Sequence, residues 1–120
     1  MAATVRTLFC ITVGQNFFDL PSDETGEVWQ AVGDMMADLA ALPGVEIIGT
    51  LDDDETMVGS SAAGFPTAYV LADVPDRETA SAACNLFRTT AVGERGHRLW
   101  KYLSVEARMG RPLVPPPPRQ

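Results

Sequence analysis

The stretch Val5-Arg6-Thr7-Leu8-Phe9-Cys10-Ile11-Thr12-Val13 begins the pattern from which the fold can be predicted. Its residues alternate between two sets. The more apolar set is Val5, Thr7, Phe9, Ile11 and Val13, and the other set is Arg6, Leu8, Cys10 and Thr12. An apolar set that recurs every second residue indicates a β-strand with one packed face. We therefore expect the side that carries Phe9 and Ile11 to face the helices.

Five further segments follow this strand in a regular order. Residues 22–42 have helical spacing, with Ser22 as the expected N-cap, and residues 45–51 and 67–74 have the pattern of strands. Residues 76–92 indicate a second helix capped by Asp76, and residues 98–108 alternate as a last strand. The order βαββαβ predicts an α+β domain of the ferredoxin-like type, a four-stranded antiparallel sheet with two helices on one face. We expect residues 1–111 to form this single domain and residues 112–120 to be a Pro-rich C-terminal tail.

Composition narrows the classes of function. The 120 residues carry a net charge of −7, which argues against nucleic acid and against an anionic membrane as partners. The apolar stretches are of strand length, so none is expected to span a membrane. The N-terminal residues lack the features of a signal peptide, and we expect a cytoplasmic protein with Cys10 and Cys84 as buried thiols. The sequence shows none of the common phosphate-loop, dinucleotide or metal motifs, so we expect no cofactor and no metal.

Two helices on one face leave the other face of the sheet to be covered. The side chains expected on this uncovered face are Arg6, Leu8, Cys10, Thr12, Tyr69, Trp100, Tyr102, Ser104, Glu106 and Arg108. Aromatic and charged groups of this kind suit a half-buried surface. Two such sheets that face each other would close a barrel with a lined cavity, so we expect a homodimer. A plain dimer interface and an interface that also holds a ligand pocket both remain open.

Candidate catalytic groups are few. Glu106 and Arg108 lie two apart on one strand, so they share a face. Glu106 could act as a general acid or base beside an Arg108 that holds a carboxylate. An ordinary ion pair at the rim of the sheet is the commoner outcome for such a pair. His97 is the one histidine and could move a proton, although a solvated loop residue is the commoner interpretation.

The long connection after the second strand carries an acidic run, Asp52-Asp53-Asp54-Glu55. We interpret this run as a solvated turn rather than a metal site, because adjacent acids point in different directions. Met57 and Phe65 lie in the same connection, and apolar groups in a long loop often cover a pocket.

The predicted arrangement resembles the dimeric α+β barrel superfamily, whose members include muconolactone isomerases, small cofactor-free monooxygenases and EthD-like proteins. A narrower likeness rests on several short stretches. These are Leu8-Phe9-Cys10-Ile11, Gln15-Asn16-Phe17-Phe18, Leu51-Asp52-Asp53-Asp54, Met57-Val58-Gly59, Cys84-Asn85-Leu86-Phe87-Arg88-Thr89-Thr90, Val92-Gly93, Leu99-Trp100-Lys101-Tyr102 and Val105-Glu106-Ala107-Arg108. Together they are similar to the IacB-like small proteins found with indole-3-acetate degradation genes. The resemblance implies a role in the catabolism of an aromatic or indolic acid, without a settled chemical step.

This resemblance also adds Asn16, Asn85, Arg88 and Thr89 to the candidate site residues, with a cap or a salt bridge as the alternative for each. The first functional hypothesis is a cofactor-free isomerase, lyase or oxygenase that acts on such an acid. Its proposed parts are Arg108 or Arg88 for the carboxylate, Glu106 or His97 for the proton, and Trp100, Tyr102, Tyr69, Phe17 and Phe18 for the ring. The alternatives are a non-catalytic ligand-binding or accessory dimer of a degradation pathway, and a dimer that holds no ligand.

Overall fold

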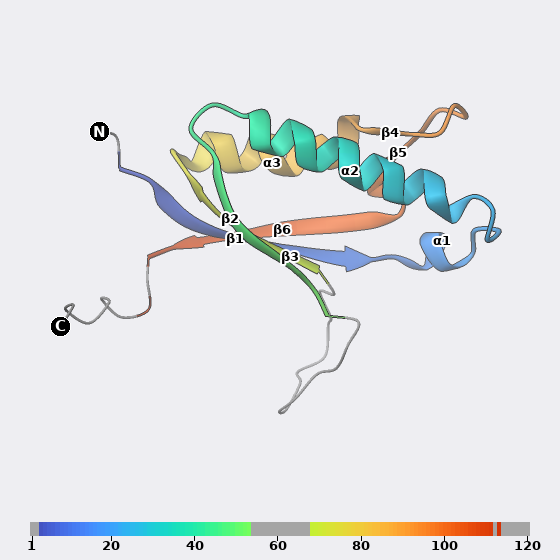
Figure 1. Ribbon diagram of the computed structural model, residues 1–120, viewed down its shortest axis with the longest axis horizontal. Coiled ribbons are helices and arrows are strands. Elements are labelled where there is room, and N and C mark those ends of the chain that lie inside the picture. The colour runs from blue at the N-terminus through green and yellow to red at the C-terminus, as the bar shows by residue number, and fades with distance from the viewer. Residues whose placement is uncertain (1–2, 54–67, 112, 114–120) are drawn as a thin grey trace.

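The computed structural model describes residues 3–53, 68–111 and 113. Four strands form one antiparallel sheet in the order β2-β3-β1-β6. In chain order they are β1 (Val5–Val13), β2 (Glu46–Asp52), β3 (Ala68–Val74) and β6 (Leu103–Gly110). Helices α2 (Thr25–Ala41) and α3 (Arg77–Thr89) both lie on the same face of this sheet (Figure 1). The α+β class is thus confirmed, and the arrangement is compatible with a ferredoxin-like fold.

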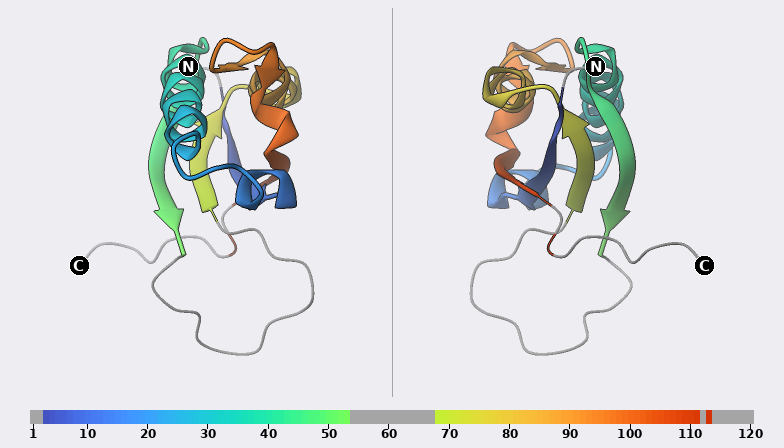
Figure 2. Two further views of the ribbon diagram at one scale, coloured as in Figure 1. Left: turned by 90° about the vertical axis from the view of Figure 1, so that its right-hand side faces the viewer. Right: turned by 90° about the vertical axis from the view of Figure 1, so that its left-hand side faces the viewer.

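The two edges of the sheet have different neighbours. Strands β2 and β6 form the edges, with α2 on the β2 side and α3 on the β6 side (Figure 2). Four short elements complete the described part of the chain. They are α1 (Gln15–Phe18), β4 (Ala91–Val92), β5 (His97–Arg98) and the 3₁₀ helix η1 (Leu99–Lys101). The hairpin β4–β5 turns through Gly93 and Gly96, whose φ angles of 61° and 84° suit glycine.

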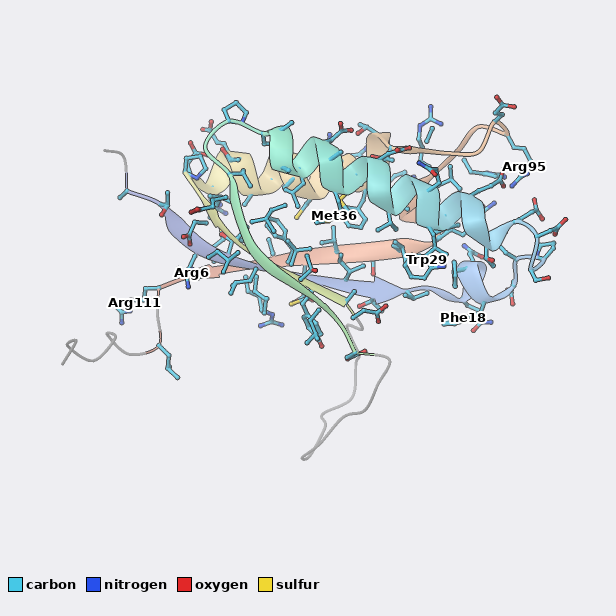
Figure 3. The ribbon with its side chains drawn as sticks, in the orientation of Figure 1. Arg6, Phe18, Trp29, Met36, Arg95 and Arg111 are labelled. Carbon is cyan, nitrogen blue, oxygen red and sulfur yellow. The ribbon has the colours of Figure 1, made fainter. Side chains whose placement is uncertain are left out.

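The core lies between the sheet and the two long helices. Thr7, Phe9 and Ile11 of β1 are buried there, which confirms the predicted orientation of this strand. The helices contribute Val28, Ala31, Met35 and Leu39 from α2 and Ala80, Ala83 and Phe87 from α3. Met36 extends from α2 toward the sheet and packs against this core (Figure 3). The apolar residues at helical spacing therefore face the sheet, as their periodicity predicts.

Some predicted boundaries are wrong. Ser22 is not the N-cap of α2, because the helix begins at Thr25 and residues before it form a turn in which the Glu24 amide donates to the Pro21 carbonyl at 2.9 Å. Asp76 is the N-cap of α3, as predicted, and its carboxylate accepts from the Thr79 amide at 2.8 Å. Helix α3 ends at Thr89 rather than at residue 92, because the chain then pairs in the β4–β5 hairpin.

The largest difference concerns the last strand, which was predicted to start at residue 98 and starts at Leu103. The Leu99 amide donates to the Thr90 carbonyl at 2.9 Å, which holds η1 beside the end of α3. As a result Tyr102 is buried in the core, with 2% of its surface exposed, and does not lie on the uncovered face. Trp100 belongs to η1, not to the strand, and lies on the helix side of the sheet.

Two groups of predictions concern residues outside the described ranges. They are those for Met57 and Phe65 and those for residues 112–120 apart from Leu113. The acidic run 52–55 is described only as far as Asp53. Within the described ranges, no helix is both long and apolar enough to cross a lipid bilayer.

The capping of α3 gives a testable pH dependence. Hydrogen bonds from the Thr79 hydroxyl and amide lower the pKa of Asp76 below its ordinary value of 3.8. A lowered pKa in the folded state means that the stabilisation is present above pH 4 and is lost as the pH falls through the lowered pKa. We expect Asp76→Ala to unfold at a lower urea concentration than the wild type at pH 7. The difference between the two urea midpoints should disappear below pH 3.

Asp76→Asn is the matched control, because asparagine keeps the capping oxygen but does not titrate. This variant should resemble the wild type at pH 7. A constant gap between the wild type and Asp76→Ala at every pH would contradict the assignment.

Candidate functional site

A groove of about 550 Å³ runs between α3 and the edge strand β6. The helix contributes Arg77, Ser81, Cys84, Asn85 and Arg88 to its lining, and the strand contributes Leu103, Val105, Ala107 and Met109. Alternate residues of a strand share a face, so these four strand residues all point toward α3. The 3.6-residue repeat of the helix likewise brings its polar residues to one side. Regular secondary structure on both walls therefore fixes the positions of the lining side chains.

The base of the groove is apolar and tightly packed. Ala80 and Phe87 are 3% and 4% exposed and belong to the core. Leu103 is also buried, and Val105 and Ala107 are partly buried. An apolar base of this kind favours a ligand with an apolar body, since its burial removes hydrocarbon surface from water.

An aromatic ring and a cation meet at one end of the groove. The Cζ atom of Arg88 lies 4.9 Å from the centroid of the Trp100 ring, within cation–π distance. Trp100 is 57% exposed, so most of this amphipathic surface is open to solvent. The hydrogen bond between Leu99 and Thr90 places η1, and with it Trp100, beside the last turn of α3.

The charged side chains of the groove lining are arginines. Of the described arginines, Arg6, Arg95 and Arg108 form ion pairs with carboxylates at 2.6–2.8 Å. Arg77 and Arg88 line the groove and, like Arg98 and Arg111 outside it, form no ion pair with a carboxylate among the described residues. The described lining also contains no aspartate, glutamate or histidine. A chain with a net charge of −7 thus presents a locally cationic groove.

Cys84 is the one thiol of the groove within the described part of the chain. It is half-buried, and burial raises the pKa of its thiol above the ordinary value of 9.0. Its sulfur is therefore mainly protonated at neutral pH and acts as a small apolar surface rather than as a nucleophile.

The uncovered face of the sheet, on the side away from α2 and α3, has a second and more apolar hollow of about 420 Å³. Leu8, Leu51, Tyr69 and Leu71 line it. In the strand register, Cys10 stands between Tyr69 on one side and Glu106 on the other. Tyr69 is thus on the face predicted for it.

The charged groups of this face are paired. The Arg108 Nη2 atom lies 2.7 Å from the Glu106 Oε2 atom, and both side chains are more than half exposed. On the same face, the Arg6 Nε atom lies 2.7 Å from the Asp73 Oδ1 atom. This second pair is a neighbour of the first, because Arg108 stands opposite Leu8 and Arg6 is the next residue of β1 on that face. Glu106 and Arg108 therefore form an ion pair at the rim of the sheet, the commoner of the two outcomes considered for them.

The candidate site residues fall into separate groups rather than one site. Asn85, Arg88 and Trp100 come together at the α3–β6 groove. Glu106, Arg108 and Tyr69 belong to the uncovered face. The remaining candidates lie at the end of the molecule formed by α1, η1 and the β4–β5 hairpin; these are Asn16, Phe17, Phe18, His97 and Tyr102. Thr89 is exposed at the end of α3, where its hydroxyl contacts helix carbonyls at 3.4 and 3.5 Å.

The residues of α1 and the hairpin have structural contacts. The Asn16 amide donates to the Lys101 carbonyl at 3.0 Å, which supports η1. The rings of Phe17 and Phe18 meet edge to face at 5.6 Å, and Phe17 meets Trp29 at 5.8 Å. Phe18 and Trp29 lie at the same end of the molecule (Figure 3).

His97 lies on the β4–β5 hairpin, away from both hollows. Its Nδ1 atom is 3.4 Å from the Lys101 Nζ atom, and its ring meets that of Tyr102 edge to face at 6.4 Å. None of these contacts brings His97 near the groove lining.

Arg77 and Ser81 are lining residues that the sequence analysis does not single out. Residues 77, 81, 84 and 88 follow one another at intervals of four, three and four, the spacing of a single helical side. This interval was the available signal. The buried apolar stripe of the same helix is the stronger pattern, and the polar residues stand beside it.

No family model matches the chain, and no curated protein matches it. Within the described residues, no group of three or more histidine, cysteine, aspartate or glutamate side chains is placed to hold a metal ion.

The state of Cys84 can be tested directly. Because burial raises the pKa of its thiol, we expect alkylation by iodoacetamide at pH 8 to be several-fold slower in the folded protein than in urea. Peptide mapping by mass spectrometry separates Cys84 from Cys10. Equal rates for Cys84 in the folded and unfolded protein would contradict its assignment as a half-buried thiol.

Proposed function

We propose that this protein binds a small aromatic carboxylic acid in the groove between α3 and β6. The observation that carries the proposal is the Arg88 guanidinium, which has no carboxylate partner among the described residues and stacks 4.9 Å over the exposed Trp100 ring. Its setting is a groove with an apolar base and no acidic residue in its described lining. The volume of about 550 Å³ falls in the usual range for small-molecule sites.

The chemistry of each part suits one part of such a ligand. Arg88 can hold a carboxylate through two parallel hydrogen bonds. The Trp100 ring offers a surface for an aromatic ring, and Val105 and Ala107 extend that surface along the strand. An indolic acid, the class implied by the resemblance to IacB-like proteins, combines these two features in one molecule.

Binding without conversion is the form of this function that the geometry favours. Isomerisation or elimination requires a group that moves a proton. Glu106 lies on the opposite face of β6 from the groove, and His97 lies on the hairpin. The described lining offers no other carboxylate or imidazole. Of the two hypotheses that include a ligand, we therefore propose the ligand-binding protein of an aromatic catabolic pathway over the cofactor-free enzyme.

A second copy of the chain is the proposed cover for the other face of the sheet. Leu8, Leu51, Tyr69 and Leu71 form an apolar centre there, and Leu51 alone is 59% exposed. The Glu106–Arg108 and Arg6–Asp73 ion pairs lie beside this centre, and two copies can share such a surface around a twofold axis. The proposed state is a homodimer with the sheets face to face, and its proposed location is the reducing cytoplasm, which suits two free cysteines.

Two matched arginine variants test the binding site. We expect Arg88→Gln to weaken the binding of indole-3-acetate by about 10- to 100-fold, because a hydrogen bond to a charged group contributes about 1.5–3 kcal/mol. Arg108→Gln removes the same charge from the opposite face and should bind as the wild type does. Isothermal titration calorimetry measures both, and the ligand should be recovered unchanged after incubation.

Loss of binding in Arg108→Gln but not in Arg88→Gln would move the site to the uncovered face and contradict the proposal. Indole-3-acetamide serves as the neutral ligand control. If it binds as tightly as the acid does, the proposed role of Arg88 is wrong.

The homodimer is tested by placing a charge in the apolar centre. We expect Leu71→Glu to shift the wild-type dimer to monomer in sedimentation velocity, because a buried unpaired carboxylate opposes association. Ala37→Glu adds the same charge on the exposed side of α2 and should remain dimeric. A wild-type protein that stays monomeric at all concentrations would contradict the proposed interface.

A further inference from the structure

The helical wall of the groove carries a cation at each end. Arg77 and Arg88 are eleven residues apart on α3, which places their Cα atoms about 16 Å apart along the axis and nearly on the same side of the helix. Ser81 and Cys84 lie between them on that side. On the opposite wall, Leu103 and Met109 mark the two ends, at a spacing of about 20 Å. The groove thus has an apolar strand wall and a helical wall with an arginine at either end.

Neither arginine forms an ion pair with a carboxylate within the described residues. Asp76 precedes Arg77, but its Oδ1 atom accepts from the Thr79 amide at 2.8 Å and from the Thr79 hydroxyl at 2.7 Å. Arg88 contacts the Trp100 ring instead of an acid. The chain has 16 acidic residues against 9 lysines and arginines, so acidic partners are not scarce. Two arginines without such partners in one groove are available to an anionic ligand.

The N-terminal end of α3 makes the position of Arg77 more favourable for an anion. Arg77 lies at the first turn of a 13-residue helix, where the helix dipole favours a negative charge. A monocarboxylic acid held by Arg88 would leave this second position without an anion. The groove is therefore longer, and more cationic, than a compact aromatic monoacid requires.

We infer that the ligand is an elongated aromatic diacid, in which Arg88 holds one carboxylate and Arg77 holds a second at the far end of the apolar body. This inference rests on the proposed function and specifies the class of its ligand. The aromatic body would lie along Val105 and Ala107, between the two charged ends. Binding then depends on the distance between the two carboxylates as well as on their number.

A pair of rigid ligands measures the contribution of the second carboxylate. Biphenyl-4-carboxylate and biphenyl-4,4′-dicarboxylate share one body and differ by one charge, and calorimetry gives the affinity of each. We expect the diacid to bind the wild-type protein at least tenfold more tightly than the monoacid. Terephthalate has two carboxylates at a shorter separation and should show no such gain over benzoate.

Two variants test whether Arg77 is responsible for the tighter binding of the diacid. Arg77→Gln should remove the advantage of the diacid and leave the affinity for the monoacid unchanged. Arg98→Gln is the control, because Arg98 is an exposed arginine of β5 that does not line the groove, and this variant should keep the full advantage.

The unfavourable outcomes are distinct. If the two biphenyl acids bind the wild-type protein equally, or if Arg77→Gln weakens both by the same factor, the second carboxylate site is wrong and the proposed function stands. If neither these biphenyl acids nor indole-3-acetate bind, the proposed function fails and this inference fails with it.

Discussion

Strand β6 lies at the edge of the sheet, and its pleat determines which of its side chains can reach α3. Leu103, Val105, Ala107 and Met109 point toward the helix, whereas Glu106 and Arg108 point to the other face. A shift of the strand by one residue would exchange the two sets. The pairing of β6 with β1, from Val13 opposite Leu103 to Arg6 opposite Gly110, excludes that shift. The apolar base of the groove therefore depends on this register.

The small side chains of α3 have a related role. Ala80 and Ala83 are each 3% exposed and pack close to the sheet, as short side chains allow. Polar and charged residues of the same helix then stand beside the contact, where they line the groove instead of facing away from it. The groove acquires its two arginines from the helix and its apolar surface from the strand.

The two faces of the sheet consequently suit different partners. Within the described residues, the helix side presents unpaired cations above an apolar base, which favours an anion with an apolar body. The other side presents an apolar centre with ion pairs beside it, which favours a second sheet of the same kind. The separation also explains why the candidate acid–base group, Glu106, does not serve the groove.

The alternation of β1 and the capping role of Asp76 could be predicted from the sequence. Both are local signals, one from the period of a strand and one from a side-chain oxygen three residues before a helix amide. The antiparallel sheet with both long helices on one face also follows from the βαββαβ order.

The positions of Trp100 and Tyr102 could not be predicted in this way. The segment 98–108 alternates throughout and so predicts one continuous strand, whereas residues 99–101 form a 3₁₀ turn whose period of three buries Leu99 and Tyr102. A tertiary hydrogen bond from Leu99 to Thr90 decides between them, and no local pattern reports such a contact. The sequence therefore predicts Trp100 and Tyr102 on the uncovered face with Glu106, whereas the structure places Trp100 at the groove and Tyr102 in the core.

Mapping amide chemical shifts by NMR, during titration with an aromatic acid, tests the central claim most directly. The account predicts that the largest changes follow α3, Trp100 and the odd-numbered residues of β6. Changes concentrated instead at Leu8, Tyr69 and Leu71 would contradict it, because the ligand would then occupy the opposite face of the sheet.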